Sequence, residues 1–258
     1  EMRERDWSSD VCSSDLVSRL GWCVQNFRGY QKKILRDAFF EAFETYETGC
    51  APVIQELNSG VRPERQTELL DRAAEAMLDE LSAGWEKKND MEDEKVILAI
   101  FFVPMVRKLQ LPVSEEFVSL LQKKWVERYP KSPFYLGDYE SISGGFRKKF
   151  LGLCFITTAV CQELGKPDDC AELTAFRAFR DGYLAAQPDG EALIREYYNI
   201  APGIVTCINT CSDRHASYER IREQYLTPCY EDLLAGRNAD CKTRYVQMVR
   251  DLERKYLN

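Results

Sequence analysis

Apolar residues recur at intervals of three and four positions along most of the chain, the spacing of helices that bury one face. Residues 27–47 show the pattern clearly, with Ile34, Leu35, Ala38 and Phe39 on one helical face. No segment alternates apolar and polar residues with the period of two that a half-buried strand shows. The pattern predicts an all-α bundle of roughly nine helices and no sheet. The nine main predicted helices cover residues 27–47, 63–84, 91–111, 114–129, 139–164, 170–187, 191–211, 213–236 and 239–257, and a short further helix is predicted at 51–57.

Glycine and proline residues mark the expected ends of these helices. Gly49, Gly165 and Gly236 each follow a predicted helix, as C-cap glycines do. Pro104 lies inside the most apolar helix and should kink it, because proline lacks a backbone donor and crowds the preceding turn. The proline-rich run at 130–133 ends another helix and favours a boundary shortly after it. The sequence therefore predicts two helical regions, residues 17–137 and 138–258.

The first sixteen residues do not share this pattern. Residues 6–16 read DWSSDVCSSDL, which resembles the translation of a sequencing-library adapter. The serine-rich composition fits neither a helix nor a strand. We therefore expect residues 1–16 to be a disordered sequence artefact and exclude them from fold reasoning. The natural start of the protein is then not known, which leaves export open.

Composition and charge narrow the function classes. The chain has 258 residues and a net charge of −7, so a broad basic surface for nucleic acid is not expected. The longest apolar run, residues 96–106, is shorter than the roughly 18 residues that a membrane-spanning helix needs. Nine of the ten cysteines lie outside the excluded segment, and their loose spacing is typical of reduced, buried thiols. We therefore expect a cytoplasmic protein without a membrane span.

One stretch, residues 153–209, carries several motifs in a fixed order. It contains the box Cys154-Phe155-Ile156-Thr157-Thr158-Ala159. Three blocks follow the box: Phe176-Arg177 with Phe179-Arg180-Asp181, then Tyr197-Tyr198, then Ala201-Pro202. Together these motifs resemble the bacterial CFI-box family, which is named after the box. The resemblance implies no particular activity, and of the cysteines here the family pattern requires only Cys154.

The box and its partner blocks also have a physical interpretation. On one helix Cys154 and Thr158 share a face, and the small side chains of the box allow a neighbouring helix to approach closely. Arg180 can pair with a carboxylate. Tyr197 and Tyr198 can bury their rings while their hydroxyls form hydrogen bonds. This interpretation predicts a packed helical hairpin around a buried polar network, with Cys154 in the middle of the helix at 139–164.

Three residues near the end of this stretch have the spacing of metal ligands. Cys207, Cys211 and His215 are four residues apart, so on one helix they would share a face. Thiolate and imidazole are common zinc ligands. Ser212 and Asp213, however, resemble a helix N-cap that would separate the ligands, and a fourth ligand is also required. We therefore expect no cofactor, with zinc as the alternative.

Candidate catalytic groups are few. A cysteine nucleophile needs a nearby histidine or a helix N-terminus, and Cys154 is expected to have neither. The chain also lacks the phosphate-loop, dinucleotide, nucleophile-elbow and zinc-protease motifs. The leading hypothesis is a non-catalytic protein that acts by binding an unidentified protein partner. One alternative is a metal-binding or thiol-redox protein that uses Cys154, Cys207, Cys211 and His215. Another is an enzyme pocket around Arg177, Arg180, Asp181 and Tyr198.

Overall fold

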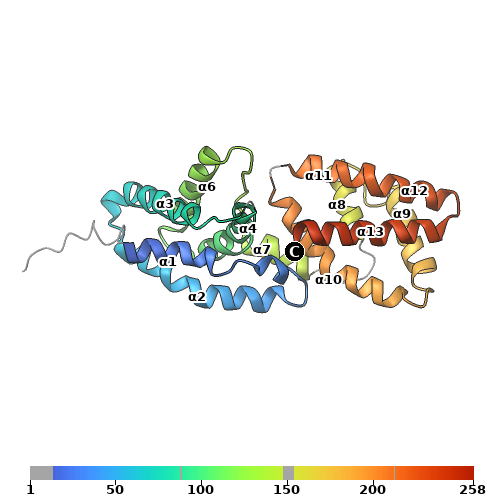
Figure 1. Cartoon of the computed structure of the whole chain (residues 1–258), viewed down its shortest axis with the longest axis horizontal. Helices are drawn as coiled ribbons and strands as arrows, with labels where there is room; N and C mark the ends of the chain where they lie inside the picture. Colours follow the sequence, from blue (N-terminus) through green and yellow to red (C-terminus); the bar gives the residue numbers. More distant parts are fainter. Residues whose placement is uncertain (1–13, 88, 148–153, 212) are drawn as a thin grey trace, which may run out of the picture. The chain divides into compact units, whose positions relative to one another are not determined.

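The fold is built from helices. The computed structural model describes residues 14–87, 89–147, 154–211 and 213–258 (Figure 1). Within the described ranges 78% of the residues are helical, and these ranges contain no strand beyond an isolated bridge between Phe134 and Cys211. The all-α prediction is therefore confirmed. These ranges hold 11 helices when segments joined by a π turn are counted as one, slightly more than the roughly nine that the spacing predicts.

The chain forms two compact units. Unit 1 comprises Glu1–Gln31, Phe40–Ser143 and Thr210–Ser212, and unit 2 comprises Lys32–Phe39, Gly144–Asn209 and Asp213–Asn258. The main division, after Ser143, lies a few residues beyond the division predicted after residue 137. Each unit also includes a short segment from the other half of the chain. A local pattern does not reveal such exchanges, because they depend on contacts between distant segments.

Unit 1 is organised around α3, which packs against α1 and α6. Apolar side chains at helical spacing, such as Leu70, Ala73, Met77 and Leu81, give α3 its buried face. The helices of this unit are α1 (Ser14–Gln25), α2 (Phe39–Gly60), α3 (Gln66–Ala83), α4 (Asp90–Ile97), α5 (Val103–Lys108), α6 (Ser114–Arg128) and most of α7 (Tyr139–Arg147). Short 3-10 turns lie at Tyr30–Lys33 and Pro63–Arg65.

Helix α1 begins inside the segment that we expected to be disordered. Residues 1–13 of that segment lie outside the described part of the chain. Ser14, Asp15 and Leu16 form the first turn of α1, and Leu16 is buried. Leu16 and Leu20 are one helical turn apart and both are buried, so they belong to the helix's apolar face. The prediction that the folded chain begins after residue 16 is therefore wrong for residues 14–16.

Helix α2 differs from the prediction at both its start and its middle. It begins at Phe39 rather than near residue 27, and it continues through Gly49 and Pro52 to Gly60. The predicted break at Gly49 is wrong. Buried residues one to three turns apart, including Tyr46, Cys50 and Leu57, form an apolar face that continues on both sides of Gly49. Burial of this face outweighs the loss of one backbone hydrogen bond at the proline.

The apolar helix predicted at 91–111 is present, and a π-turn segment lies within it. Helix α4 ends at Ile97, a π-turn segment η4 (Leu98–Phe102) follows, and α5 begins at Val103. Pro104 occupies the first turn of α5, where its missing N–H costs least. The wider π turn accommodates the proline without breaking the helix. None of the helices within the described ranges is long and apolar enough to cross a membrane.

Unit 2 is organised around α10 and α13, which pack against each other. Helix α8 packs on α10, and α12 packs on α13 (Figure 1). The helices of this unit are α8 (Phe155–Glu163), α9 (Ala171–Ala178), α10 (Gly190–Asn209), α11 (Arg214–Ile221), α12 (Thr227–Leu234) and α13 (Asn238–Tyr256). Two further π-turn segments, η5 (Phe179–Leu184) and η6 (Arg222–Leu226), extend α9 and join α11 to α12.

The prediction of one continuous helix over residues 139–164 is wrong, although both ends of this range are helical. Helix α7 ends at Arg147, residues 148–153 lie outside the described part of the chain, and α8 begins at Phe155. Cys154 has non-helical dihedral angles (φ −102°, ψ 80°) and precedes α8 as its N-cap residue. The predicted helix ends at Gly165 and Gly236 are confirmed, because both glycines have positive φ and stop their helices.

A buried carboxylate connects α12 to α13. Asp232 accepts hydrogen bonds from Arg237 (Nε 2.9 Å, Nη2 2.7 Å) and from Arg244 Nε (2.9 Å). The hydrogen bonds from Arg237, together with those from Arg244 and both positive charges, lower the pKa of Asp232. The stability that this network contributes is fully present above the unfolded-state pKa of about 4 and is lost as the pH falls through the lower folded-state pKa.

We expect Asp232→Asn to lower the melting temperature (Tm) at pH 7. The difference from wild type should shrink toward pH 2, because the wild-type carboxyl group is then protonated and no longer ionic. Thermal melts followed by circular dichroism across this pH range measure both effects. Asp240→Asn is the matched control. Asp240 is exposed, and its contact with Arg237 is longer, at 3.7 Å, so this substitution should change Tm less. Equal losses of Tm at both pH values would contradict the electrostatic origin.

Candidate functional site

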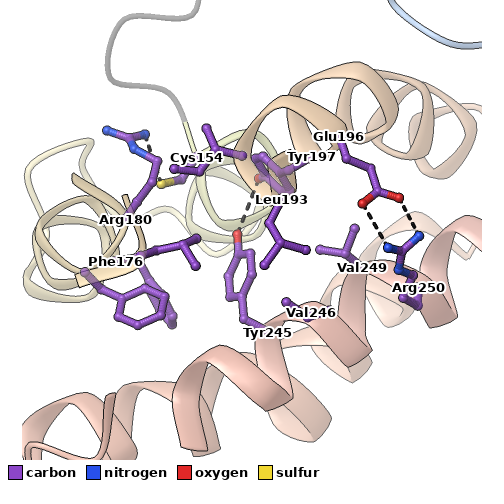
Figure 2. Close-up of a pocket in the computed structure, with 13 residues that line it drawn as sticks. Cys154, Phe176, Arg180, Leu193, Glu196, Tyr197, Tyr245, Val246, Val249 and Arg250 are labelled. Atoms are coloured by element: carbon purple, nitrogen blue, oxygen red, sulfur yellow. Dashed lines mark hydrogen bonds and ion pairs between the residues drawn. The ribbon is translucent and has the colours of Figure 1, made fainter. Parts of the chain in front are cut away.

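Unit 2 contains a partly open cavity of about 50 Å³ lined by α9, η5, α10 and α13, with Cys154 at one end (Figure 2). Its wall is mainly apolar. The lining residues are Cys154, Phe176, Phe179, Arg180, Leu184, Leu193, Ile194, Glu196, Tyr197, Tyr245, Val246, Val249 and Arg250. Figure 2 shows Arg180 beside Cys154 at one side, and an ion pair between Glu196 and Arg250 at the other. The apolar side chains lie between these polar pairs.

Helical spacing explains which side chains reach the cavity. On α10, Leu193 and Tyr197 are one turn apart and face the same side. On α13, Tyr245 and Val249 have the same relation. Arg180 lies in η5 and is buried, with 9% of its surface exposed, although it is charged. The cavity is therefore where the apolar faces of three helical segments meet.

Two tyrosines connect the cavity to the start of α8. The hydroxyl oxygen of Tyr197 accepts a hydrogen bond from the backbone N–H of Ile156 (2.9 Å), which satisfies a free donor in the first helical turn. The Tyr245 hydroxyl lies 3.4 Å from the Tyr197 hydroxyl and 3.2 Å from Thr157 Oγ1. Burial raises the pKa of both tyrosines, so both phenols are neutral. Part of the predicted polar network thus holds α8 in place.

Arg180 is the centre of a second polar group. Its Nε and Nη2 donate to the carboxylate of Asp181 (2.6 and 2.8 Å), and its Nη1 donates to the Tyr198 hydroxyl (3.0 Å). The same Nη1 lies 3.6 Å from Cys154 Sγ, the contact drawn in Figure 2. The hydrogen bond to Asp181 is the main reason that the pKa of Arg180 is raised. Arg180 therefore stays charged while its carboxylate and phenol partners satisfy it.

Cys154 is placed differently from the prediction but remains a weak nucleophile. It precedes a helix N-terminus and contacts Arg180, two features that favour a thiolate. Burial acts in the opposite direction and is the larger effect, so the pKa of Cys154 is raised rather than lowered. The thiol is therefore neutral at rest. We expected low reactivity from the sequence because Cys154 would lie in the middle of a helix, and that predicted position is wrong.

The other motif residues contribute to packing around the cavity. The ring of Phe155 meets that of Tyr198 edge-on (centroids 6.0 Å apart), and Ile156 and Thr158 are buried. Arg177 instead pairs with Asp168 (Nη2 to Oδ1 2.8 Å) and does not line the cavity. The structure thus brings together Cys154, Arg180, Asp181, Tyr197 and Tyr198, whereas Ala159, Arg177 and Pro202 lie elsewhere on α8, α9 and α10.

The opposite wall of the cavity was not predicted as part of a site. Glu196 and Arg250 form a two-point ion pair, one contact of which is Nη2 to Oε2 at 2.9 Å. Val246 and Val249 lie between this pair and the tyrosines. These residues come from α10 and α13, which are far apart in sequence. No spacing rule relates them, so only the pairing of opposite charges could have suggested a contact.

The three predicted zinc ligands are not brought together. Helix α10 ends at Asn209 and α11 begins at Arg214, so the spacing of four does not lie on one helix. Cys207 is buried in α10, and Cys211 is half-buried in the bridge to Phe134. His215 is 63% exposed, and its ring lies 3.3 Å from Glu163 and 3.6 Å from Glu219. Across the described ranges, no group of three or more His, Cys, Asp or Glu residues is placed to hold a metal ion.

Comparison with known proteins adds nothing to this geometry. No family model, curated protein or solved structure matches the chain. The resemblance to the CFI-box family therefore stays a prediction from the motifs. Residues of those motifs meet at the cavity in unit 2, which is therefore the candidate functional site.

Proposed function

We propose that the protein is a non-catalytic binding protein that holds one apolar side chain of a partner protein in the cavity of unit 2. The observation that carries the proposal is a small cavity with an apolar wall and polar groups that are already paired. The proposal places the protein in a reducing compartment such as the cytoplasm. No disulfide bond joins any of the nine cysteines within the described ranges, and reduced thiols persist in such a compartment.

The pairing of the polar groups indicates an apolar occupant. Arg180 is satisfied by Asp181 and the Tyr198 hydroxyl, and Glu196 by Arg250. A polar ligand would have to displace these partners or leave its own groups unpaired, and each buried unpaired group costs about 1–3 kcal/mol. An apolar group incurs no such cost and gains from leaving water.

The size of the cavity favours a side chain over a cofactor. Sites for small molecules and cofactors usually measure about 300–1,000 Å³. The cavity here is about 50 Å³. Since one water needs about 10–15 Å³, this space holds roughly four non-hydrogen atoms, as many as a leucine side chain has. Single apolar anchors in such pockets often dominate the energy of protein–protein interfaces.

The surroundings of the cavity resemble the layout of an interface. Leu193, Ile194 and Val246 line it and are half-buried, so they are also part of the surface. The charged pair of Glu196 and Arg250 lies at the side and is partly exposed. An apolar centre with a polar rim is the usual arrangement of binding sites between proteins. The thiol-redox alternative through Cys154 is less favoured, because the buried thiol stays protonated.

A leucine analogue tests the proposal directly. We expect N-acetyl-leucine amide to shift the methyl NMR signals of Leu193, Ile194, Val246 and Val249 in a saturable manner, because its side chain enters the cavity. N-acetyl-glycine amide, which lacks the side chain, should leave these signals unchanged. In Val246→Phe the added ring occupies the cavity, so the response to the leucine analogue should disappear. Val126→Phe, at an exposed position of unit 1, is the matched control and should keep it.

A peptide selection then tests whether the occupant belongs to a protein. Peptides selected on the wild-type chain and counter-selected on Val246→Phe should share one aliphatic residue at a fixed position. Two results would contradict the proposal. One is an equal NMR response to both amino-acid analogues, and the other is a selection in which every bound peptide also binds Val246→Phe.

A further inference from the structure

Two cysteines of unit 2 lie side by side although they belong to different helices. Cys161 is in the last turn of α8, and Cys170 is the N-cap residue of α9. Their sulfur atoms are 3.8 Å apart. A disulfide bond is about 2 Å long, so the two atoms need to approach by only about 2 Å to form one. Residues 162–169 connect them as a short turn, which permits a movement of this size.

We propose that Cys161 and Cys170 form a thiol–disulfide exchange site whose substrate is a small, negatively charged disulfide. Cys170 is the attacking thiol and Cys161 the resolving thiol. The site is distinct from the cavity of the proposed function and uses neither Cys154 nor the cysteines considered as zinc ligands.

Access distinguishes this pair from the other neighbouring cysteines. Cys170 is half-buried and keeps part of its surface in contact with solvent, whereas Cys161 is only 4% exposed. Two further pairs within the described ranges, Cys23 with Cys50 and Cys229 with Cys241, are also hydrogen-bonded neighbours. All four of those cysteines are fully buried. A dissolved disulfide can therefore reach Cys170 but not the members of the other two pairs.

A cavity beside the pair indicates the charge of the substrate. It measures about 210 Å³. Cys161 forms part of its wall, whereas Cys170 lies outside the wall and adjoins it through the 3.8 Å contact between the two sulfur atoms. Lys166 and Arg222 line it as well, against a single carboxylate, Glu172, which pairs with Lys166. Arg222 has a further partner, Glu223, at 3.5 Å outside this wall. The wall thus carries a positive balance, which attracts a disulfide that bears carboxylates.

The exchange is balanced in two steps. The Cys170 thiolate attacks one sulfur of the small disulfide, forms a mixed disulfide and releases one small thiolate. The Cys161 thiolate then attacks the sulfur of Cys170, forms the Cys161–Cys170 bond and releases the second small thiolate. The protons of both cysteines end on the two released thiols. The protein loses two electrons, and the small disulfide is reduced by the same two.

The electrostatics suit this order of attack. Burial, followed by the hydrogen bond with Cys170, raises the pKa of Cys161 to about 12, while the charge of Lys166 opposes the shift. Cys161 is therefore protonated at rest and does not compete for the substrate. It reacts once the mixed disulfide places an electrophilic sulfur next to it.

Glutathione disulfide serves as the probe in the test. The reduced full chain is incubated with it under native conditions, alkylated, and digested with two proteases. One cuts after glutamate and separates Cys161 from Cys170 at Glu163, and the other, chymotrypsin, separates Cys154 from Cys161 at Phe155. We expect a disulfide-linked peptide pair containing Cys161 and Cys170, which dithiothreitol removes. Cys229→Ser should form the same bond at the wild-type rate. A folded wild-type chain that forms no such bond, or links other cysteines instead, would overturn the proposal.

Two single variants test the order of attack. In Cys161→Ser the mixed disulfide should accumulate on Cys170, because nothing resolves it. In Cys170→Ser no adduct should form on Cys161 in the native state. The reversed pattern would overturn the assignment of the attacking thiol. If Cys161→Ser does not fold, the peptide map of the wild type still decides whether the bond forms.

Reaction rates with a charged and a neutral disulfide test the charge of the substrate. Wild type should react several-fold faster with glutathione disulfide than with the neutral bis(2-hydroxyethyl) disulfide at low salt, and added salt should reduce this ratio. Lys166→Gln should reduce the ratio toward one. A ratio that is the same in wild type and in Lys166→Gln would contradict recognition of a negatively charged substrate.

Discussion

Replacing Phe101 with alanine is expected to lower the free energy of unfolding of unit 1 by about 3–5 kcal/mol, the usual cost of removing a buried phenylalanine. Phe101 lies in η4 and is fully buried. Its ring centroid is 5.6 Å from that of Tyr30, 6.1 Å from that of Phe43 and 5.5 Å from that of Tyr46. The substitution removes the shared neighbour of three rings, one at Tyr30 and two on α2, so the space left behind cannot be filled by one local shift.

Hydrogen exchange of unit 1 amides in denaturant measures this loss without requiring that both units unfold together. Tyr135→Ala is the matched control, because it also removes an aromatic ring but from a side chain that is 53% exposed. We expect it to change the free energy of unfolding by less than about 1 kcal/mol. Similar losses of unfolding free energy in both variants would contradict the central position of Phe101 among the rings of Tyr30, Phe43 and Tyr46.

Gly203→Ala is expected to destabilise unit 2 by about 1–3 kcal/mol or more, as other substitutions that overpack a core do. A Cβ atom at residue 203 would lie 1.8 Å from the backbone carbonyl oxygen of Ile34. That segment cannot move away easily, because the N–H of Arg36 donates to the carbonyl of Asn199 (3.0 Å) on the same helix, α10. Only a residue without a side chain permits this close approach of a loop to a helix.

The same substitution at Gly144 should have the opposite sign. Gly144 lies within α7, and a Cβ atom there would meet no atom within 4 Å. Alanine is favoured over glycine in a helix by roughly 0.5–1 kcal/mol, so Gly144→Ala should stabilise the protein by about that amount. Thermal and denaturant unfolding of the two variants measure the contrast. If Gly203→Ala left stability unchanged or raised it, the close approach of Gly203 to Ile34 would not exist as described, and a loss of stability in Gly144→Ala would contradict the open space at Gly144.

The spacing of apolar residues predicted the helical class well because that spacing is a local property. The buried face of α3 can be read directly from Leu70, Ala73, Met77 and Leu81. Glycine caps at Gly165 and Gly236 were equally readable. The errors occurred where tertiary contacts outweighed a local signal, as in α2, which continues through Gly49 because its apolar face is buried on both sides of the glycine.

The candidate site was predictable only in part. Motif order drew attention to Cys154, Arg180 and Tyr197, which do meet at the cavity. The ion pair of Glu196 with Arg250 was not predicted, since nothing in the local sequence relates α10 to α13. The π turns were missed for a similar reason. One extra residue in a helical turn changes which side chains face inward, but it leaves the composition of the segment unchanged.

Local chemistry alone thus decided that this chain forms helices, where several of them end and which residues face a core. Periodicity and turn residues act over a few positions, so they can be read without a partner segment. The tertiary structure decided that Cys161 lies against Cys170, that Arg180 is buried beside Cys154, and that the predicted zinc ligands stay apart. These outcomes depend on how separate helices pack, and the free energy of that packing comes from surfaces that are distant in the sequence.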